Sequence, residues 1–189
     1  MELERIINTG HLYVASNIFP QWLVDQVNTV DWLSAAYDRV SIGNFKRRHL
    51  IHTYARDDEF DKYVRTVIAP QIERECGITF TDTQQHSFNL WIDEPGFKPR
   101  MHTDGDLASA LQIYWLPSNR TDLGTAFYST NQIRDLTHYF PNIPNTGYLM
   151  LNSHEPRPKL WHDMEQEVPE GVLRLCMYIT FGPYLPVHR

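Results

Sequence analysis

Two residues near the middle of the chain, His102 and Asp104, have the types and the spacing to bind one metal ion. In an extended segment, residues i and i+2 point to the same side of the backbone, so this spacing presents an imidazole nitrogen and a carboxylate oxygen together. Two ligands are too few for a protein metal site, and a third has to come from another part of the chain. Two histidines and one carboxylate on one face of a metal would leave its other positions open.

The third ligand has two candidates. The segment that follows the strand-like residues 147–151 contains His154 and His162, and the residues alone leave the choice between them open. We interpret the other histidines of the chain, such as His86 and His138, as ordinary surface or hydrogen-bonded residues.

An arginine, Arg174, begins a strongly apolar segment that runs to residue 181. Burying its charge there would be costly unless it met an anion. A guanidinium is planar and can bind a carboxylate through two parallel hydrogen bonds. The segment therefore predicts a binding site for a carboxylate, such as that of a dicarboxylate co-substrate.

This set of residues resembles the 2-oxoglutarate/Fe(II) dioxygenases, and within them the short prolyl 4-hydroxylase-like group. That family has a His-x-Asp motif, a distal histidine some tens of residues later and a basic residue a little further on. His102, Asp104 and Arg174 match these positions, and the spacing to Arg174 favours His162 over His154. The resemblance covers about half of the chain and includes four further short segments, namely 95–96, 113–117, 124–127 and 144–149.

The resemblance implies a site with Fe(II), 2-oxoglutarate and O2, from which succinate and CO2 would be released. Arg174 would hold the distal carboxylate of 2-oxoglutarate. Tyr114 or Trp115 would lie beside it, and the phase of their strand decides which one. The chain departs from the family at Asp93, where many relatives have a tyrosine, and at Cys176, where a serine is frequent.

The implied reaction is hydroxylation of a C–H bond in a peptidyl, including prolyl, or small amino-acid-like substrate. Candidate substrate contacts are Trp91, Arg100 and Arg134. We expect no catalytic residue beyond the metal ligands. Two alternatives remain: a non-catalytic barrel that binds a ligand or a partner protein, and a different metalloenzyme on a cupin-like barrel.

The hydrophobic pattern predicts two regions. Apolar residues at helical spacing indicate helices around 22–33 and 60–72. From residue 79, β-branched and aromatic runs alternate with turn residues, which predicts strands at 84–92, 110–116, 125–128, 147–151 and 173–181. We expect one α+β, mainly β domain over residues 1–189, with helical support in 1–78 and a double-stranded β-helix (jelly-roll, cupin-like) core in 79–189.

The composition narrows the class of partner. A formal net charge of −6 argues against general nucleic-acid binding. The two cysteines form no C-x-x-C pair, and the N-terminus has no basic start followed by an apolar run. No apolar stretch approaches the roughly 20 residues needed to span a bilayer. These features predict a cytoplasmic protein without membrane association, and they say nothing about its oligomeric state.

Overall fold

The computed structural model describes residues 1–6, 11–29, 37–40, 47–50, 58–82, 87–104, 109–151 and 160–187. His86 and His154 lie outside these residues. The strands are β1 (Glu2–Arg5), β2 (Leu12–Ser16), β3 (Tyr37–Val40), β4 (Arg47–Leu50), β5 (Ile78–Phe80), β6 (Ser87–Asp93), β7 (Ser109–Leu116), β8 (Thr125–Tyr128), β9 (Leu136–Phe140), β10 (Thr146–Leu151), β11 (Trp161–Asp163), β12 (Arg174–Phe181) and β13 (Tyr184–Pro186).

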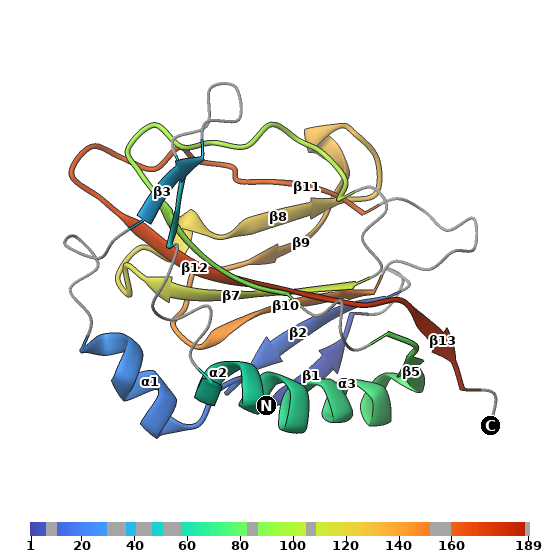
Figure 1. The fold of residues 1–189 in the computed structure, drawn as a ribbon. Helices are drawn as coiled ribbons and strands as arrows, with labels where there is room; N and C mark the ends of the chain where they lie inside the picture. Colours follow the sequence, from blue (N-terminus) through green and yellow to red (C-terminus); the bar gives the residue numbers. More distant parts are fainter. Residues whose placement is uncertain are drawn as a thin grey trace.

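The described part of the chain is mainly β, and its paired strands are antiparallel. A large sheet has the order β1-β2-β10-β7-β12-β6-β4-β3, and a small sheet has the order β11-β8-β9. Strands β5 and β13 form a separate pair. Figure 1 shows the small sheet above one face of the large sheet and the helices below the other face.

The helices are α1 (Gln21–Asn28), α2 (Asp58–Tyr63) and α3 (Ala69–Cys76), with a π-helical turn at Val64–Ile68 between the last two. Pro70 lies in the first turn of α3 and has no backbone N–H to continue the α-helical bonding. The turn before it closes with a bond from the Ala69 N–H to the Val64 carbonyl. The helices bury Leu23, Phe60 and Ile72 against the large sheet in the main hydrophobic core.

The five predicted strands are confirmed: the strand at 125–128 has the predicted bounds, and the others differ by one residue at an end, while residues 84–86 of the first lie outside the described residues. Both predicted helical regions are confirmed as well, although α1 ends at Asn28, before residue 33. Gly147 lies where no side chain fits, because a Cβ there would be 1.8 Å from the carbonyl oxygen of Gln112 on the neighbouring strand. Gly147 therefore allows β10 and β7 to pair closely.

Residues 1–78 contain more than the predicted helices. They also contribute β1, β2, β3 and β4, which are the two outer strands on each side of the large sheet. Arg47 and Arg48 belong to β4 and pair with β6. The stretch between the predicted strands 125–128 and 147–151 contains a further strand, β9. These strands are short, and short strands have weak sequence signals.

Within the described residues, every helix is too short or too polar to cross a membrane.

Candidate metal centre

The two histidines of the centre are held by one pair of backbone hydrogen bonds. The N–H of His102 donates to the carbonyl of His162 at 3.0 Å, and the N–H of His162 donates to the carbonyl of His102 at 2.9 Å. Further along, Gly96 donates to Val168 at 2.8 Å in the same antiparallel pairing. Segments distant in the sequence thus run side by side, and this fixes the separation of the two rings.

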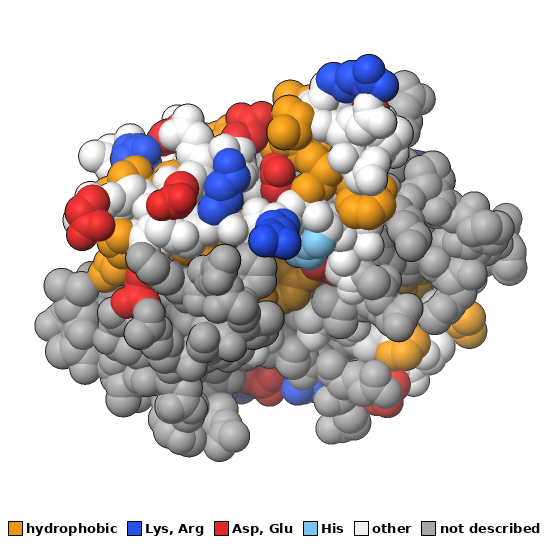
Figure 2. Space-filling view, turned by 90° about the horizontal axis from the view of Figure 1, so that it is seen from above, with side chains coloured by type: hydrophobic (Ala, Val, Ile, Leu, Met, Phe, Trp, Pro, Cys, Tyr) orange, Lys and Arg blue, Asp and Glu red, His pale blue; other side chains and the backbone are white. Residues whose placement is uncertain are grey.

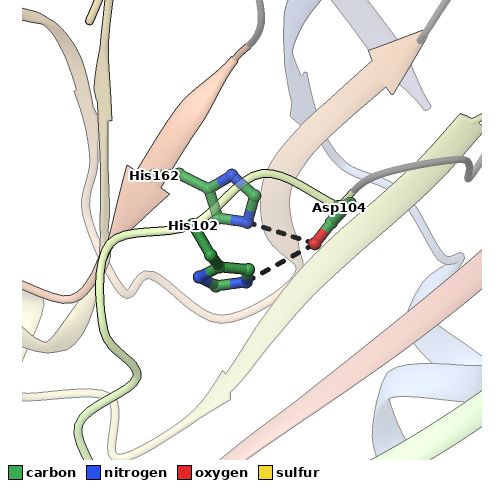
Figure 3. A group of neighbouring side chains, drawn as sticks. All are labelled: His102, Asp104 and His162. Carbon is green, nitrogen blue, oxygen red and sulfur yellow. Dashed lines mark ion pairs between the residues drawn. The ribbon is translucent and has the colours of Figure 1, made fainter. Parts of the chain in front are cut away.

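Asp104 completes a compact group with these histidines, as Figure 3 shows. Its Oδ1 lies 3.5 Å from Nε2 of His102 and 3.4 Å from Nε2 of His162. The three ligand atoms lie within 4.8 Å of one another. The three residues therefore form a candidate metal site, and the predicted choice of His162 agrees with this geometry.

Backbone carbonyls orient both imidazole rings. Nδ1 of His102 lies 2.7 Å from the carbonyl oxygen of Arg100, and Nδ1 of His162 lies 3.1 Å from that of Leu160. A carbonyl oxygen only accepts hydrogen bonds, so each Nδ1 carries the proton. Each Nε2 then faces Asp104 and is the ring nitrogen that would bind a metal.

Tyr178 on β12 holds the carboxylate of Asp104. Its hydroxyl donates to Oδ2, the oxygen that does not face the histidines. Burial by itself would raise the pKa of Asp104, but hydrogen bonds from His102, His162 and Tyr178 and the charge of His162 lower that pKa well below its usual range. Asp104 is therefore a carboxylate, and its Oδ1 is available to a cation.

The centre is open on one side. The side chain of His102 is 45% exposed, whereas those of Asp104 and His162 are 12% and 6% exposed. Figure 2 shows a histidine ring at the molecular surface, beside a Lys or Arg side chain and at the border of a recess. Behind His162, the ring of Phe127 stacks at 5.1 Å. A molecule from solution would therefore approach on the His102 side.

Arg174 is buried on β12 directly opposite Asp93 of β6. Its Nη1 donates to Oδ2 of Asp93 at 2.6 Å. Burial acts to lower the pKa of the guanidinium, but the Cys176 and Asp93 groups beside it raise that pKa above its ordinary value. The predicted buried arginine thus exists, and it already has one carboxylate partner within the protein.

The other edge of the guanidinium has an available donor. Nε of Arg174 is buried and has no hydrogen-bond partner among the described residues. The ring of Tyr114 lies 5.4 Å from the central carbon of the guanidinium, and its hydroxyl donates to Oγ1 of Thr125. Of the two candidates for a neighbour of Arg174, the structure places Tyr114 there.

Trp115 is on the opposite side of β7. Its ring packs 6.0 Å from that of Phe19 in the core beneath the helices. The prediction that Trp115 lies in the co-substrate site is therefore not supported. The register of β7 against β12 shifts here, since Leu175 pairs with Leu116 but Cys176 pairs with Tyr114. Trp115 is the additional residue of this β-bulge.

The three candidate substrate contacts have different locations. Trp91 is half-buried and stacks on Tyr178 at 5.0 Å, so it adjoins the centre. Arg100 is exposed, and its carbonyl holds His102. Arg134 is in the 3₁₀ turn Ile133–Asp135 between β8 and β9, with a 79% exposed side chain whose acidic neighbour is Asp135. No described contact connects Arg134 to the metal ligands.

Two features of the centre were missed by sequence reasoning, namely the contact of Tyr178 with Asp104 and the pairing of Asp93 with Arg174. Tyr178 is four residues after Arg174, so a strand assignment places both on one side of β12. Asp93 directly follows the predicted apolar strand 84–92, and a carboxylate at that position was a signal for a buried partner. Neither side chain could be matched to its partner without the strand register.

No protein-family model and no curated protein sequence matches the chain. Solved structures do match it. A prolyl-4-hydroxylase from Pseudomonas putida has a TM-score of 0.61 and 14% identity, covering 92% of this chain and 93% of that one. The non-heme alpha-ketoglutarate-dependent epimerase SnoN from nogalamycin biosynthesis has a TM-score of 0.59 and 11% identity, covering 93% and 78%. The chain has a 2-oxoglutarate/Fe(II) oxygenase-like fold. This confirms the predicted resemblance at the level of the fold.

Proposed function

We propose that the chain is an Fe(II)- and 2-oxoglutarate-dependent oxygenase that hydroxylates a C–H bond in a peptidyl, including prolyl, or small amino-acid-like substrate. The observation that carries the proposal is the convergence of His102, Asp104 and His162, with Arg174 on the strand that also holds Tyr178. The similar fold of a prolyl-4-hydroxylase and of a non-heme alpha-ketoglutarate-dependent epimerase supports the assignment.

The donor set fits a divalent iron. Two imidazole nitrogens and one carboxylate oxygen occupy one side of a metal and leave open positions, as in non-haem Fe(II) oxygenases. The carbonyls of Arg100 and Leu160 fix the tautomers, and the Tyr178 hydroxyl fixes the carboxylate. Such outer partners hold metal ligands in position and sustain their affinity.

The residues around Arg174 fit a carboxylate ligand. Its Nη1 is paired with Asp93, but its Nε, on the other edge of the guanidinium, has no partner within the part of the chain that the structure describes. A buried donor without a partner is costly, and a carboxylate oxygen would satisfy it. Arg174 is the residue that would hold the distal carboxylate of 2-oxoglutarate.

The order of the strands supports a double-stranded β-helix. From β6 onward the chain alternates between the sheets: β6 lies in the large one, His102 bridges to the small one, and β7 returns to the large one. Strands β8 and β9 are in the small sheet, β10 in the large, β11 in the small and β12 in the large. This alternation is what a jelly roll would have, and it supports that part of the proposal. The same alternation brings the His102 and His162 segments together.

When bound, Fe(II) and 2-oxoglutarate would supply the oxidation of a C–H bond by O2, with release of succinate and CO2. The protein's residues provide binding, orientation and exclusion of water. His102, Asp104 and His162 would hold the metal, and Phe127 and Tyr148 form an apolar wall behind it. Trp91 and Arg100 adjoin the open side, where a substrate would bind.

The test is metal- and co-substrate-dependent formation of succinate by the purified chain. We expect succinate only when both Fe(II) and 2-oxoglutarate are present, and none with His102→Ala. That substitution removes an exposed ligand and should leave the fold intact.

His138→Ala is the matched control, because His138 is half-buried and packs on Phe140 outside the centre. It should retain the activity. Equal turnover by the His102→Ala variant would refute the assignment. Metal binding without any turnover of 2-oxoglutarate would favour a non-catalytic barrel.

A further inference from the structure

The pair formed by Arg174 and Asp93 is unusual for a carboxylate-binding site because both charges are fully enclosed. The side chain of Arg174 is 2% exposed and that of Asp93 is 0% exposed. Cys176 lies beside both, with its sulfur 3.8 Å from Nη1 of Arg174 and 3.9 Å from Oδ2 of Asp93. Solvent therefore does not screen either charge, and the negative charge of Asp93 offsets the positive charge of Arg174 within the protein.

The negative charge of Asp93 weakens the electrostatic attraction between Arg174 and a carboxylate ligand. A guanidinium without an acidic partner attracts a carboxylate by its net charge as well as by hydrogen bonds. Here an entering carboxylate would meet an ion pair without net charge. The negative charge of Asp93 would also repel it, and solvent would screen this repulsion only weakly. The N–H donors of Arg174 that do not face Asp93 remain for the ligand, among them Nε, which has no partner among the described residues.

We propose that Asp93 determines the co-substrate specificity of the site by neutralising Arg174. The site then recognises the distal end of a 2-oxo acid as a hydrogen-bond acceptor more than as an anion. It discriminates weakly between a distal carboxylate and a neutral carbonyl group of similar shape. This inference rests on the proposed function, since it concerns the co-substrate of the same site.

The test measures dissociation constants of 2-oxoglutarate and of its 5-methyl ester by titration calorimetry, with Mn(II) in place of Fe(II). The ratio of the two constants in each variant reports how strongly the distal charge is recognised. The additional methyl group affects every variant alike, so it cancels when ratios are compared. No turnover is needed for this measurement.

Asp93→Asn keeps an acceptor for Nη1 and removes the negative charge. We expect the preference for 2-oxoglutarate over the ester to rise on the order of tenfold. The positive charge of Arg174 is then no longer offset by Asp93, and it strengthens the hydrogen bond from Arg174 to the distal carboxylate. An unchanged or smaller preference would overturn the proposal. Asp122→Asn is the matched control, since Asp122 pairs with Arg120 at 2.6 Å on the surface, and it should leave the ratio unchanged.

A second variant covers the case in which Asp93→Asn does not fold. The double variant Asp93→Asn/Arg174→Gln again has a neutral pair, and we expect its preference to stay within about threefold of the wild type. A loss of preference of about tenfold or more would mean that the charge of Arg174 acts despite Asp93, which contradicts the proposal.

Failure of the proposed function and failure of the role of Asp93 give different results. If the wild type binds neither compound in the presence of metal, the proposed function is wrong and the specificity proposal falls with it. If the wild type binds 2-oxoglutarate and the Asp93→Asn ratio does not rise, the proposed function stands and only the role of Asp93 is wrong.

Discussion

The two faces of β12 have opposite compositions although they alternate residue by residue. Leu175, Met177 and Ile179 are buried in the core beneath the helices. Arg174 and Tyr178, on the other face, contact Asp93 and Asp104. One strand thus contributes to stability on one side and to the candidate chemistry on the other.

The comparison extends to β7, where Ile113 and Trp115 lie in the core under the helices and Tyr114 adjoins Arg174. Since the faces are separated by a single layer of backbone, substitutions one residue apart should have different effects. Substitutions on the two faces therefore test whether metal binding and stability are separable.

The largest effect should come from Asp104→Ala. It removes one of the three candidate metal ligands, and the described residues of the centre contain no further carboxylate that could replace it. Because the loss of an outer partner alone costs about 10–100-fold in metal affinity, the loss of the ligand should cost more than about 100-fold. Calorimetric titration with Mn(II) measures the metal affinity of this variant, and an unchanged affinity would exclude Asp104 as a ligand.

Met177→Ala should act on the opposite face. Met177 is fully buried among apolar side chains, so truncation should lower the free energy of unfolding by about 2–5 kcal/mol. Denaturant unfolding measures this change. Metal affinity of the folded variant should equal that of the wild type, and a parallel loss of metal binding would show that the faces are coupled.

Tyr178→Phe should act on the metal without removing a ligand. It deletes the hydroxyl that donates to Oδ2 of Asp104 and keeps the ring that stacks on Trp91. We expect metal affinity to fall by about 10-fold or more. Phe181→Leu, on the helix side of the same strand, is the control and should leave the affinity unchanged. Equal effects of the two substitutions would contradict the positioning role of Tyr178.

The smallest effect should distinguish two adjacent aromatic residues. Tyr114→Phe removes a hydrogen bond to Thr125 beside Arg174, at a cost of about 0.5–1.5 kcal/mol in unfolding free energy. It should also change the dissociation constant of 2-oxoglutarate. Trp115→Phe should leave that constant unchanged because Trp115 packs against Phe19. A reversed pattern would mean that Trp115 contributes to the site.

The sequence by itself determined the local parts of this protein. The spacing of His102 and Asp104 places both side chains on one side of the backbone, whatever the remainder of the fold does. The alternation of turn residues with β-branched and aromatic runs predicted the five central strands, because that pattern acts over a few residues. Arg174 was recognised because a charge at the start of an apolar strand requires a partner.

The tertiary structure decided which distant residues meet. His162 joins His102 only through a backbone pairing between segments separated by several strands. Asp93 proved to be the partner of Arg174 because β6 and β12 pair in one register, and the bulge at Trp115 set which side Tyr114 faces. Such registers result from the packing of the whole sheet, and no local pattern in the chain encodes them.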